Sequence, residues 1–276
     1  MSQAGPEIEV EYDFEYDGRT LSSYGFVMCD FSGGGSIEEV EAGAKITFVT
    51  VPRNGGAKHS LVNAKYESGL TCSFDICLNP CVADSMELTQ SDIRDIMRWL
   101  NRREFLPFHF IGDDTFNCYF NASFNVTKLV VDGKVYGLRL EMETDAPYGY
   151  GDELTFTWSA AAANYTYRIM NQSDEIGYLY PTLAITVRAD CDFTITNDTF
   201  GGSSVIKNCK AGETITMYGD TNIIETDRSG HDICDDFNYE FFRIGNNMSE
   251  RRNMITVSHP CSVTLKYRPV IKGTLQ

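Results

Sequence analysis

Charged and apolar residues alternate without a break near the start of the chain. From Glu7 to Asp17 every odd position carries a carboxylate, and every even position is aliphatic or aromatic. Because successive side chains of a β-strand point to opposite faces, the pattern predicts a long strand with an apolar face and an acidic face. Two interpretations of the acidic face stay open: it protects a sheet edge against aggregation, or it is a functional anionic surface.

One segment has helical periodicity instead. Its apolar residues recur at i, i+3, i+4 and i+7 and so share one helix face; they are Ile93, Ile96, Met97 and Leu100. Thr89 or Ser91 is suited to cap the N-terminus, and Asp92 lies favourably in the first turn. The pattern therefore predicts a helix from Ser91 to about Asn101.

The strongest hairpin signal lies in the middle of the chain. Asp132-Gly133 separates an alternating run over residues 127–131 from another over residues 134–143. Both turn positions of a tight hairpin must tolerate positive φ, which Asp-Gly does well. We therefore expect two antiparallel strands joined by this turn.

The second half of the chain is punctuated differently. Between Asp145 and Pro181 small and turn-forming residues dominate, which we interpret as a domain boundary near Tyr150 and a connecting segment over residues 151–180. Short strand patterns with evenly spaced glycine and proline turns follow, as is typical of a β-sandwich or jelly roll. The sequence thus predicts a mainly β protein with domains at 1–150 and 151–276.

The charge balance excludes some classes of function. A formal net charge of -16 disfavours proteins that read nucleic acids through phosphate contacts and proteins that bind anionic membranes. An acidic protein can still handle DNA as the wall of a conduit, because a negative wall repels phosphates. Hydrophobic residues make up 42% of the chain, which fits a folded soluble protein, and no apolar run is long enough to predict a membrane span.

The expected redox state of the nine cysteines depends on the compartment in which the protein resides. The first residues have neither a basic start nor an apolar core, so we expect no secretory signal. Reduced thiols that pack as small core residues are then the expectation. Cys72, Cys77 and Cys81 resemble a metal half-site, but zinc spacing differs and no nearby histidine completes the set, so packing along a strand is the preferred interpretation.

No motif indicates catalysis. His231-Asp232 and the following Cys234-Asp235-Asp236 collect possible ligands but lack the oxygen ladder of a calcium loop, so we expect a solvated loop. None of the four histidines sits in a motif that pairs it with a nucleophile, and no phosphate-binding loop is present. We expect no enzyme activity, no catalytic residue, no metal and no cofactor.

A polar cluster stands out near the end of the chain. Arg251 and Arg252 lie close to Asn247 in the sequence. In a lectin-like sandwich such a cluster would line a sugar groove or contact a partner. A basic turn between two strands is the alternative.

Several segments, taken in order, carry a family resemblance. Val51-Pro-Arg-Asn-Gly55 is similar to a Pro-Gly-Arg-x-Gly loop without its first glycine, and Asp92 to Leu100 is similar to a helix ending in Trp-Leu. The family is that of the distal tail proteins of siphovirus-type bacteriophages, and the resemblance covers almost the whole chain. The other matching segments are Phe14–Phe26, Asn117–Phe124, the Asp132-Gly133 hairpin, Thr144–Tyr150, Tyr180–Ile185, Phe193–Asn197, Gly212–Met217, Gly245–Val257 and Val263–Arg268.

The resemblance implies a structural protein of the virion tail tip, assembled in the host cytoplasm. The N-terminal domain would be a β-sandwich with one helix and an extended β-arm, and six copies would close into a ring. The C-terminal domain would be a galectin-like sandwich. Implied partners are further copies of the chain, the major tail tube protein, a tail-associated lysin or baseplate hub protein, and receptor-binding or adaptor proteins, with genomic DNA passing through the lumen. The alternative is a carbohydrate-binding module that uses the galectin-like domain for host attachment.

The segment Ile46 to Tyr66 is our candidate for the arm. It has the pattern strand, loop, strand, and we expect it to pair with a neighbouring copy so that open sheet edges are closed within the ring. The expected ring contacts near its tip are Val51, Arg53, Asn54 and Gly55. The expected sugar or partner contacts of the second domain are Asn247, Arg251 and Arg252.

Overall fold

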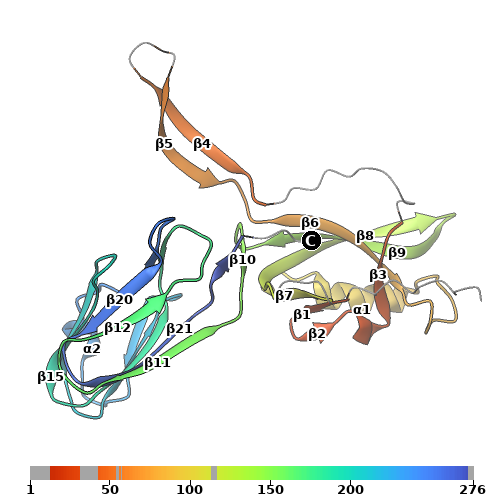
Figure 1. Ribbon diagram of the computed structural model, residues 1–276. Coiled ribbons are helices and arrows are strands. Elements are labelled where there is room, and N and C mark those ends of the chain that lie inside the picture. Colours follow the sequence, from red (N-terminus) through yellow and green to blue (C-terminus); the bar gives the residue numbers. More distant parts are fainter. Residues whose placement is uncertain (1–12, 32–42, 54–55, 57, 113–116, 273–276) are drawn as a thin grey trace, which may run out of the picture. The chain divides into compact units, whose positions relative to one another are not determined.

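The computed structural model describes residues 13–31, 43–53, 56, 58–112 and 117–272 (Figure 1). The protein is mainly β, as predicted. It separates into two compact units: unit 1 runs to Tyr150 and also contains Lys272, and unit 2 is Gly151–Ile271. No helix in the described part of the chain is long and apolar enough to cross a membrane.

Unit 1 combines a large sheet, a helix and a separate hairpin. The sheet has the order β2-β1-β7-β8-β9-β6-β3, and β4 pairs with β5 alone. The helices are η1 (Ser22–Tyr24) and α1 (Gln90–Leu100). The strands are β1 (Asp13–Tyr16), β2 (Arg19–Thr20), β3 (Phe26–Cys29), β4 (Ile46–Pro52), β5 (His59–Tyr66), β6 (Thr71–Leu78), β7 (Leu106–Ile111), β8 (Phe120–Val131), β9 (Lys134–Thr144) and β10 (Gly149–Tyr150).

Helix α1 begins where the sequence predicts it. The Thr89 side chain accepts a hydrogen bond from the Asp92 N–H, and the Asp92 carboxylate accepts one from the Thr89 N–H, which closes a capping box. The apolar stripe turns toward the sheet, and Ile96 and Leu100 are fully buried. The predicted helix is confirmed.

Aromatic rings fill the space between α1 and the sheet. Phe14 and Tyr16 of β1 are completely buried and alternate with Asp13 and Glu15, so the predicted alternation is confirmed for these positions; residues 7–12 lie outside the described residues. The Trp99 indole N–H donates to the Tyr16 carbonyl over 3.0 Å, which ties the helix to the first strand. Burial raises the pKa of the Tyr16 hydroxyl to about 12.

The hairpin at Asp132-Gly133 is confirmed. Strands β8 and β9 pair antiparallel, and the two turn residues have φ values of 50° and 79°. Leu138 and Leu140 of the returning strand are fully buried against α1 and its neighbours. This hairpin therefore supplies the middle of the sheet and much of the unit 1 core.

Unit 2 is a sandwich of two antiparallel sheets, with the orders β11-β21-β14-β17-β18 and β12-β20-β15-β16. The short helix is α2 (Ile233–Asp236). The strands are β11 (Leu154–Ala160), β12 (Tyr165–Met170), β13 (Gly177–Leu179), β14 (Thr182–Val187), β15 (Cys191–Asn197), β16 (Ser203–Cys209), β17 (Thr214–Tyr218), β18 (Ile223–Thr226), β19 (Ile244–Asn246), β20 (Arg252–Val257), β21 (Cys261–Tyr267) and β22 (Val270–Ile271).

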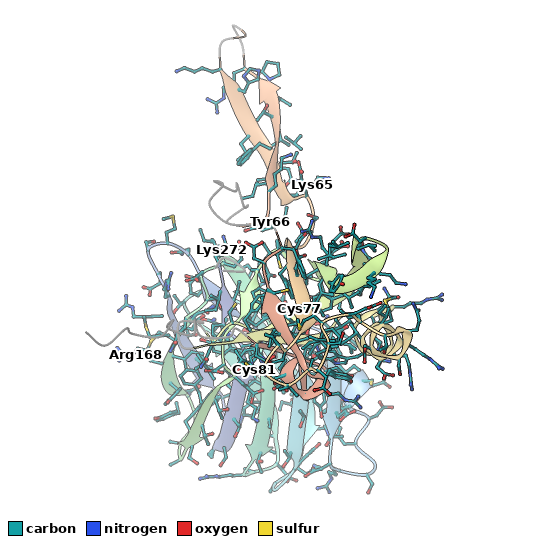
Figure 2. All side chains as sticks on the ribbon, turned by 90° about the vertical axis from the view of Figure 1, so that its right-hand side faces the viewer. Lys65, Tyr66, Cys77, Cys81, Arg168 and Lys272 are labelled. Carbon is teal, nitrogen blue, oxygen red and sulfur yellow. The ribbon has the colours of Figure 1, made fainter. Side chains whose placement is uncertain are left out.

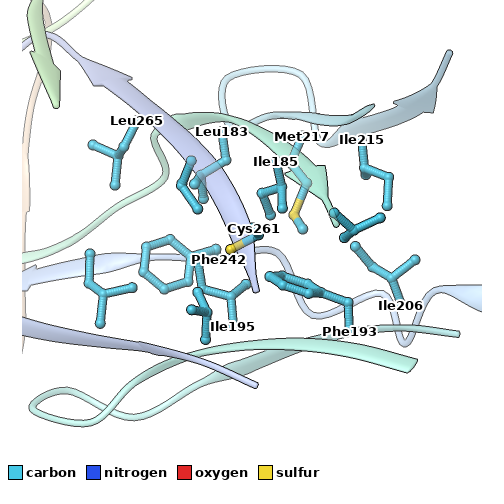
Figure 3. Packing of buried hydrophobic residues seen from close by; sticks show 14 of the residues in the cluster. Leu183, Ile185, Phe193, Ile195, Ile206, Ile215, Met217, Phe242, Cys261 and Leu265 are labelled. Atoms are coloured by element: carbon cyan, nitrogen blue, oxygen red, sulfur yellow. The ribbon is translucent and has the colours of Figure 1, made fainter. Parts of the chain in front are cut away.

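Alternating side chains of the two sheets meet in one apolar core. In β14, for example, Leu183, Ile185 and Val187 are fully buried while Thr182, Ala184 and Thr186 are half-buried on the outer face. Figure 3 shows residues of the two sheets, among them Leu183, Phe193 and Ile195, packed against one another. The predicted sandwich is confirmed.

The prediction of a connecting segment over residues 151–180 is wrong. This stretch supplies β11 and β12, one strand to each sheet, and also the short strand β13. Trp158 and Ala160 of β11 are buried in the core. The small and threonine-rich outer positions of these strands lowered the apolar content of the segment without interrupting the strands.

Candidate functional site

Strands β4 and β5 form a hairpin that we call the arm (Ile46–Tyr66). They pair antiparallel from Ile46 opposite Tyr66 to Pro52 opposite His59. At the tip the Arg53 N–H donates to the Lys58 carbonyl over 2.7 Å. Below the base, the Lys45 ammonium lies 3.3 Å from the Glu67 carboxylate. The predicted strand, loop and strand are therefore confirmed as a paired hairpin.

The arm exposes apolar side chains on both of its faces. Phe48 is 61% exposed on one face of β4, and Val49 and Val51 are exposed on the other. In β5, Leu61 and Val62 lie at the register shift of the ladder and are 59% and 62% exposed. Figure 2 shows the side chains along both strands, with Lys65 and Tyr66 labelled near the base. An apolar surface of this kind on an otherwise well-packed protein is typical of a protein–protein contact.

The arm is also basic within an acidic chain. Residues 45–67 contain Lys45, Arg53, Lys58 and Lys65 but only one acidic residue, Glu67, whereas the whole chain has a net charge of -16. The Thr47 hydroxyl and the Lys45 ammonium hold the pKa of Glu67 below its usual range. The charge of the arm is therefore complementary to the rest of the same protein.

Two of the four expected ring contacts can be placed. Val51 is 48% exposed on the arm, and Arg53 sits at the start of the tip with its side chain hydrogen-bonded to the Ser60 hydroxyl. Asn54 and Gly55 lie outside the described residues. The role of these four residues in a ring stays a prediction.

The large sheet of unit 1 has an acidic outer face. Leu140 and Met142 of β9 point into the core, so Glu141 and Glu143, which alternate with them, point outward and are exposed. Glu15 of β1 lies on the same outer face. Arg139 adds no free positive charge there, because it binds the Asp75 carboxylate through two hydrogen bonds of 2.8 and 3.0 Å.

The polar cluster of unit 2 is largely occupied by local contacts. The Asn247 side-chain carbonyl accepts hydrogen bonds from the N–H groups of Ser249 and Glu250, which folds the turn before β20. The Arg252 guanidinium donates a hydrogen bond to the Glu250 carboxylate and lowers the pKa of that carboxyl to about 2. Arg251 is exposed beside this turn. Asn247 and Arg252 are thus brought together through Glu250, and a sugar or partner contact at these residues stays a prediction.

The expectation of a solvated loop at His231 is wrong. The His231 side chain is buried, with Nδ1 2.5 Å from a Glu213 oxygen and Nε2 3.3 Å from an Asp236 oxygen. Burial alone would raise the pKa of Glu213, but hydrogen bonds from Thr226, His231 and the Lys210 N–H together hold it below its ordinary value. The network fastens the loop before α2 to Glu213, the residue before β17, and through it to Thr226 of β18. Its acidic partner Glu213 lies 18 residues away in sequence, so local spacing gave no signal for it.

A second feature that the sequence analysis missed is an exposed aromatic cluster on unit 2. The Arg243 guanidinium lies 4.1 Å over the ring of Tyr178, which is 53% exposed. Phe200 meets the same ring edge to face and also covers Gly245, where a side chain would collide with it. Ile176 and Tyr180 beside Tyr178 are exposed as well. Tyrosine and arginine are the residue types that dominate protein contacts.

The three cysteines of the possible zinc half-site do not converge. Cys72 and Cys77 are five positions apart on β6 and so lie on opposite faces of the strand, and Cys81 is exposed beyond its end. Figure 2 labels Cys77 and Cys81. Among the described residues no group of three or more histidine, cysteine or acidic side chains is arranged to hold a metal ion.

Comparisons with known proteins agree with this architecture. Residues 10–146 match the family model of a phage tail protein N-terminal domain, and residues 148–267 match that of a phage tail C-terminal domain. No curated protein matches the chain. The SPP1 Dit protein, whose crystal structure is described as a paradigm of the hub adsorption apparatus in phages infecting Gram-positive bacteria, has a similar fold. The TM-score is 0.66 at 13% identity, over 93% of this chain and 98% of that one.

The two family models together account for nearly the whole chain, and the likeness to Dit shows that both units share that fold. The resemblance to distal tail proteins drawn from the sequence is confirmed. The chain belongs to a family of structural bacteriophage tail proteins with the Dit fold.

Proposed function

We propose that the protein is a hub of the phage tail tip, in which six copies close into a ring that joins the tail tube to the baseplate. Each arm would lie against the neighbouring copy, and unit 2 would carry receptor-binding or adaptor proteins. The partners along the axis would be the major tail tube protein and a tail-associated lysin or baseplate hub protein. No step of this role requires catalysis.

The observation that carries the proposal is the arm. Its exposed apolar residues on both faces have no cover within the described chain, and its positive charge matches the acidic remainder of a second copy. Within the described part of the chain, the large sheet ends in the edge strands β2 and β3, which a closed ring would place next to a neighbour. A head-to-tail ring, in which the arm of one copy covers a different surface of the next, satisfies all three features with one partner.

Deleting Pro52 to Ser60 tests the proposal. The deletion removes the tip and shortens both strands of the arm without touching the core of unit 1. We expect soluble monomer by light scattering where the intact chain forms rings. The matched control is V130S/V131S at the tip of the β8–β9 hairpin, which removes two equally exposed apolar side chains outside the arm and should leave the rings intact. Rings that survive the deletion would defeat the proposal.

The acidic outer face of the unit 1 sheet is our candidate for the channel wall. Glu15, Glu141 and Glu143 would repel DNA phosphates and so keep the genome from adhering during passage. In phages carrying E141Q/E143Q, genome ejection should slow. D95N on the solvent side of α1 serves as the control, because it removes a charge from the opposite side of the sheet. Unchanged ejection kinetics in E141Q/E143Q would count against this assignment.

The aromatic cluster around Tyr178 supports a carrier role for unit 2. Tyr178, Tyr180 and Ile176 form an exposed apolar surface beside Arg243, which suits docking of an adaptor protein. Virions with Y178S should contain less receptor-binding protein at unchanged tail length. A normal protein composition of these virions would remove the surface from the proposal.

The carbohydrate-binding alternative receives less support from the geometry. Asn247 and Arg252 already bind within their own turn, which leaves Arg251 as the exposed member of the cluster. A glycan array probed with the full chain and with R251A tests it directly. Strong binding that R251A abolishes would establish a sugar site at this turn.

A further inference from the structure

Two cysteines of unit 2 face each other across neighbouring strands. Cys191 of β15 and Cys209 of β16 are direct partners in the antiparallel register, and both are reduced in the structure. Opposite residues of antiparallel strands have Cα atoms roughly 4.5–5.5 Å apart. A disulfide needs a Cα separation of about 4.4–6.8 Å. The pair therefore sits within the range that a disulfide spans without backbone movement.

A β-bulge creates this pairing. Phe193 lies opposite Ile206, so an unbroken register would set Asn208, and not Cys209, against Cys191. The extra residue is accommodated by Asn208, which has a φ of 57°. A bulge of this kind re-aims the side chains that follow it.

The bulge is held in place from two sides. The Asn208 N–H donates to the Asp192 carboxylate over 2.9 Å, and the Asn208 side-chain amide donates to both Asp236 oxygens at 2.9 and 3.0 Å. Asp236 in turn faces His231. Side-chain hydrogen bonds therefore fix the bulge that places the two thiols opposite each other.

The two thiols differ in access. Cys191 is half-buried at the margin of the core, whereas Cys209 is fully buried and its thiol donates to the Ile206 carbonyl over 3.4 Å. A small reagent in solution can therefore reach Cys191 first. Cys209 reacts only with a partner that is already bound at Cys191.

We propose that Cys191 and Cys209 are an oxidative modification site, which a low-molecular-weight disulfide such as oxidised glutathione converts into a cross-strand disulfide. The Cys191 thiolate attacks one sulfur of the reagent, forms a mixed disulfide and releases the first reagent thiol. The Cys209 thiolate then attacks the Cys191 sulfur, closes the protein disulfide and releases the second. Two protein thiols are oxidised, one reagent disulfide is reduced, and the two cysteine protons end on the released thiols.

The environment of the pair makes the reaction slow at neutral pH. Burial raises the pKa of Cys191 and raises that of Cys209 to about 12, so little of either thiol is ionised. The dithiol is therefore kept in a reducing cytoplasm and closes gradually in the oxidising medium that a virion enters. The disulfide would fasten β16, an edge strand of its sheet, to β15.

Unit 1 contains an internal control. Cys29 of β3 hydrogen-bonds Cys77 of β6, and β3 is also an edge strand. However, Cys29 lies opposite Asp75 and Cys77 lies opposite Val27, so the two thiols are diagonal neighbours. Diagonal positions have Cα atoms about 7–8 Å apart, so these two thiols are in contact but a disulfide between them requires backbone movement.

The experiment compares the two pairs in the same full-length protein. The purified chain is incubated with oxidised glutathione at mildly alkaline pH, its remaining thiols are alkylated under denaturing conditions, and its peptides are mapped by mass spectrometry. We expect two of the nine thiols to be lost to a Cys191–Cys209 link that dithiothreitol reverses, while Cys29 and Cys77 are alkylated. Nine alkylated cysteines, a Cys29–Cys77 link of equal yield, or a link from Cys191 to a cysteine other than Cys209 would each overturn the proposal.

Single substitutions test the order of events. In C209S the reaction should stop at the glutathione adduct of Cys191, and in C191S neither position should carry an adduct. An adduct on Cys209 in C191S would show that Cys209 is reached directly and would overturn the assigned order. Because the mapping of the unsubstituted chain needs no variant, poor folding of C209S would leave the central test intact.

Discussion

Two hairpins of unit 1 have the same connectivity but differ in how much of their surface is buried. In the β8–β9 hairpin one face is buried, and Leu138 and Leu140 have no exposed surface. In the arm neither face is buried, and Phe48, Leu61 and Val62 are each about as exposed as a surface residue. Both hairpins pair through antiparallel ladders with one register shift each, between Val49 and Thr50 in the arm and between Leu129 and Val130 in the other, so backbone hydrogen bonding does not distinguish them.

The difference lies in how apolar residues are distributed over the two faces. β9 alternates apolar and polar positions, which suits a sheet with one covered face. β4 carries Phe48 and Val49 next to each other, and β5 carries Leu61 and Val62. An isolated hairpin is marginally stable in water, and apolar residues exposed on both of its faces are typical of a surface that a partner covers. The arm therefore has apolar residues at neighbouring positions, as in a strand that is buried on both faces, but they are exposed in the single chain. This combination is typical of an assembly contact.

The largest contrast should appear when one phenylalanine is truncated in each hairpin. Phe124 of β8 is buried among the aromatic rings of the core, so F124A should lower the free energy of unfolding by about 3–5 kcal/mol. F48A in the arm should change the free energy of unfolding by less than about 0.5 kcal/mol, because the Phe48 side chain is largely exposed and contributes little to the core. Urea unfolding of the monomeric protein measures both.

Equal losses in F124A and F48A would contradict the comparison. They would mean that the arm packs onto its own unit in solution. Unfolding should be followed at a protein concentration low enough that no rings form, since assembly adds its own stabilisation.

A smaller contrast is expected at the two turns. Gly133 and Gly56 have φ values of 79° and 71°, and neither has an atom within 4 Å of an added Cβ, so backbone strain is the whole effect of a substitution. G133A should cost about 1–2 kcal/mol of unfolding free energy, because the turn closes a hairpin of the core. G56A should leave the unfolding free energy of unit 1 unchanged. A destabilisation by G56A as large as that by G133A would show that the arm folds as part of the core.

Sequence patterns predicted the elements that depend on neighbours in the chain. The cap of α1 at Thr89, the Asp132-Gly133 turn and the alternation from Asp13 to Tyr16 are local, and each is present as expected. The strand β11 was missed because its core contacts, such as Trp158 with Tyr167 and the ladder to β21, come from other parts of unit 2. Its own composition resembles a linker, and only the partner strands make it a strand.

The candidate functional surfaces also differ in whether they depend on local or on distant residues. The arm was predictable from its strand, loop and strand pattern, since both strands adjoin in sequence. The buried contact of His231 with Glu213 and the stacking of Arg243 on Tyr178 join residues from separate strands and loops. Spacing along the sequence does not predict such contacts. Asn247 and Arg252 were noticed for their polarity, but Glu250 between them, which binds both, was overlooked.

The smallest effect concerns charge. Reversing Lys58 and Lys65 in K58E/K65E leaves the apolar residues of the arm in place but removes its attraction to an acidic neighbour. Assembly should weaken by roughly tenfold at low ionic strength and by much less near 1 M salt, where screening acts over about 3 Å. Sedimentation velocity at the two salt concentrations measures it. Reversing Lys210 and Lys266 of unit 2 in the same way should have little effect, and an equal loss there would assign the effect to net charge alone.

The central claim is that the arm is folded by its own chain and covered by another. Its most direct test is sedimentation of the intact protein beside F48S/L61S/V62S, with urea unfolding of both at low concentration. The account predicts rings of six for the intact chain, single copies for the variant, and the same unfolding midpoint for the two. An intact chain that stays single at high concentration, or a variant that still forms rings, would contradict it.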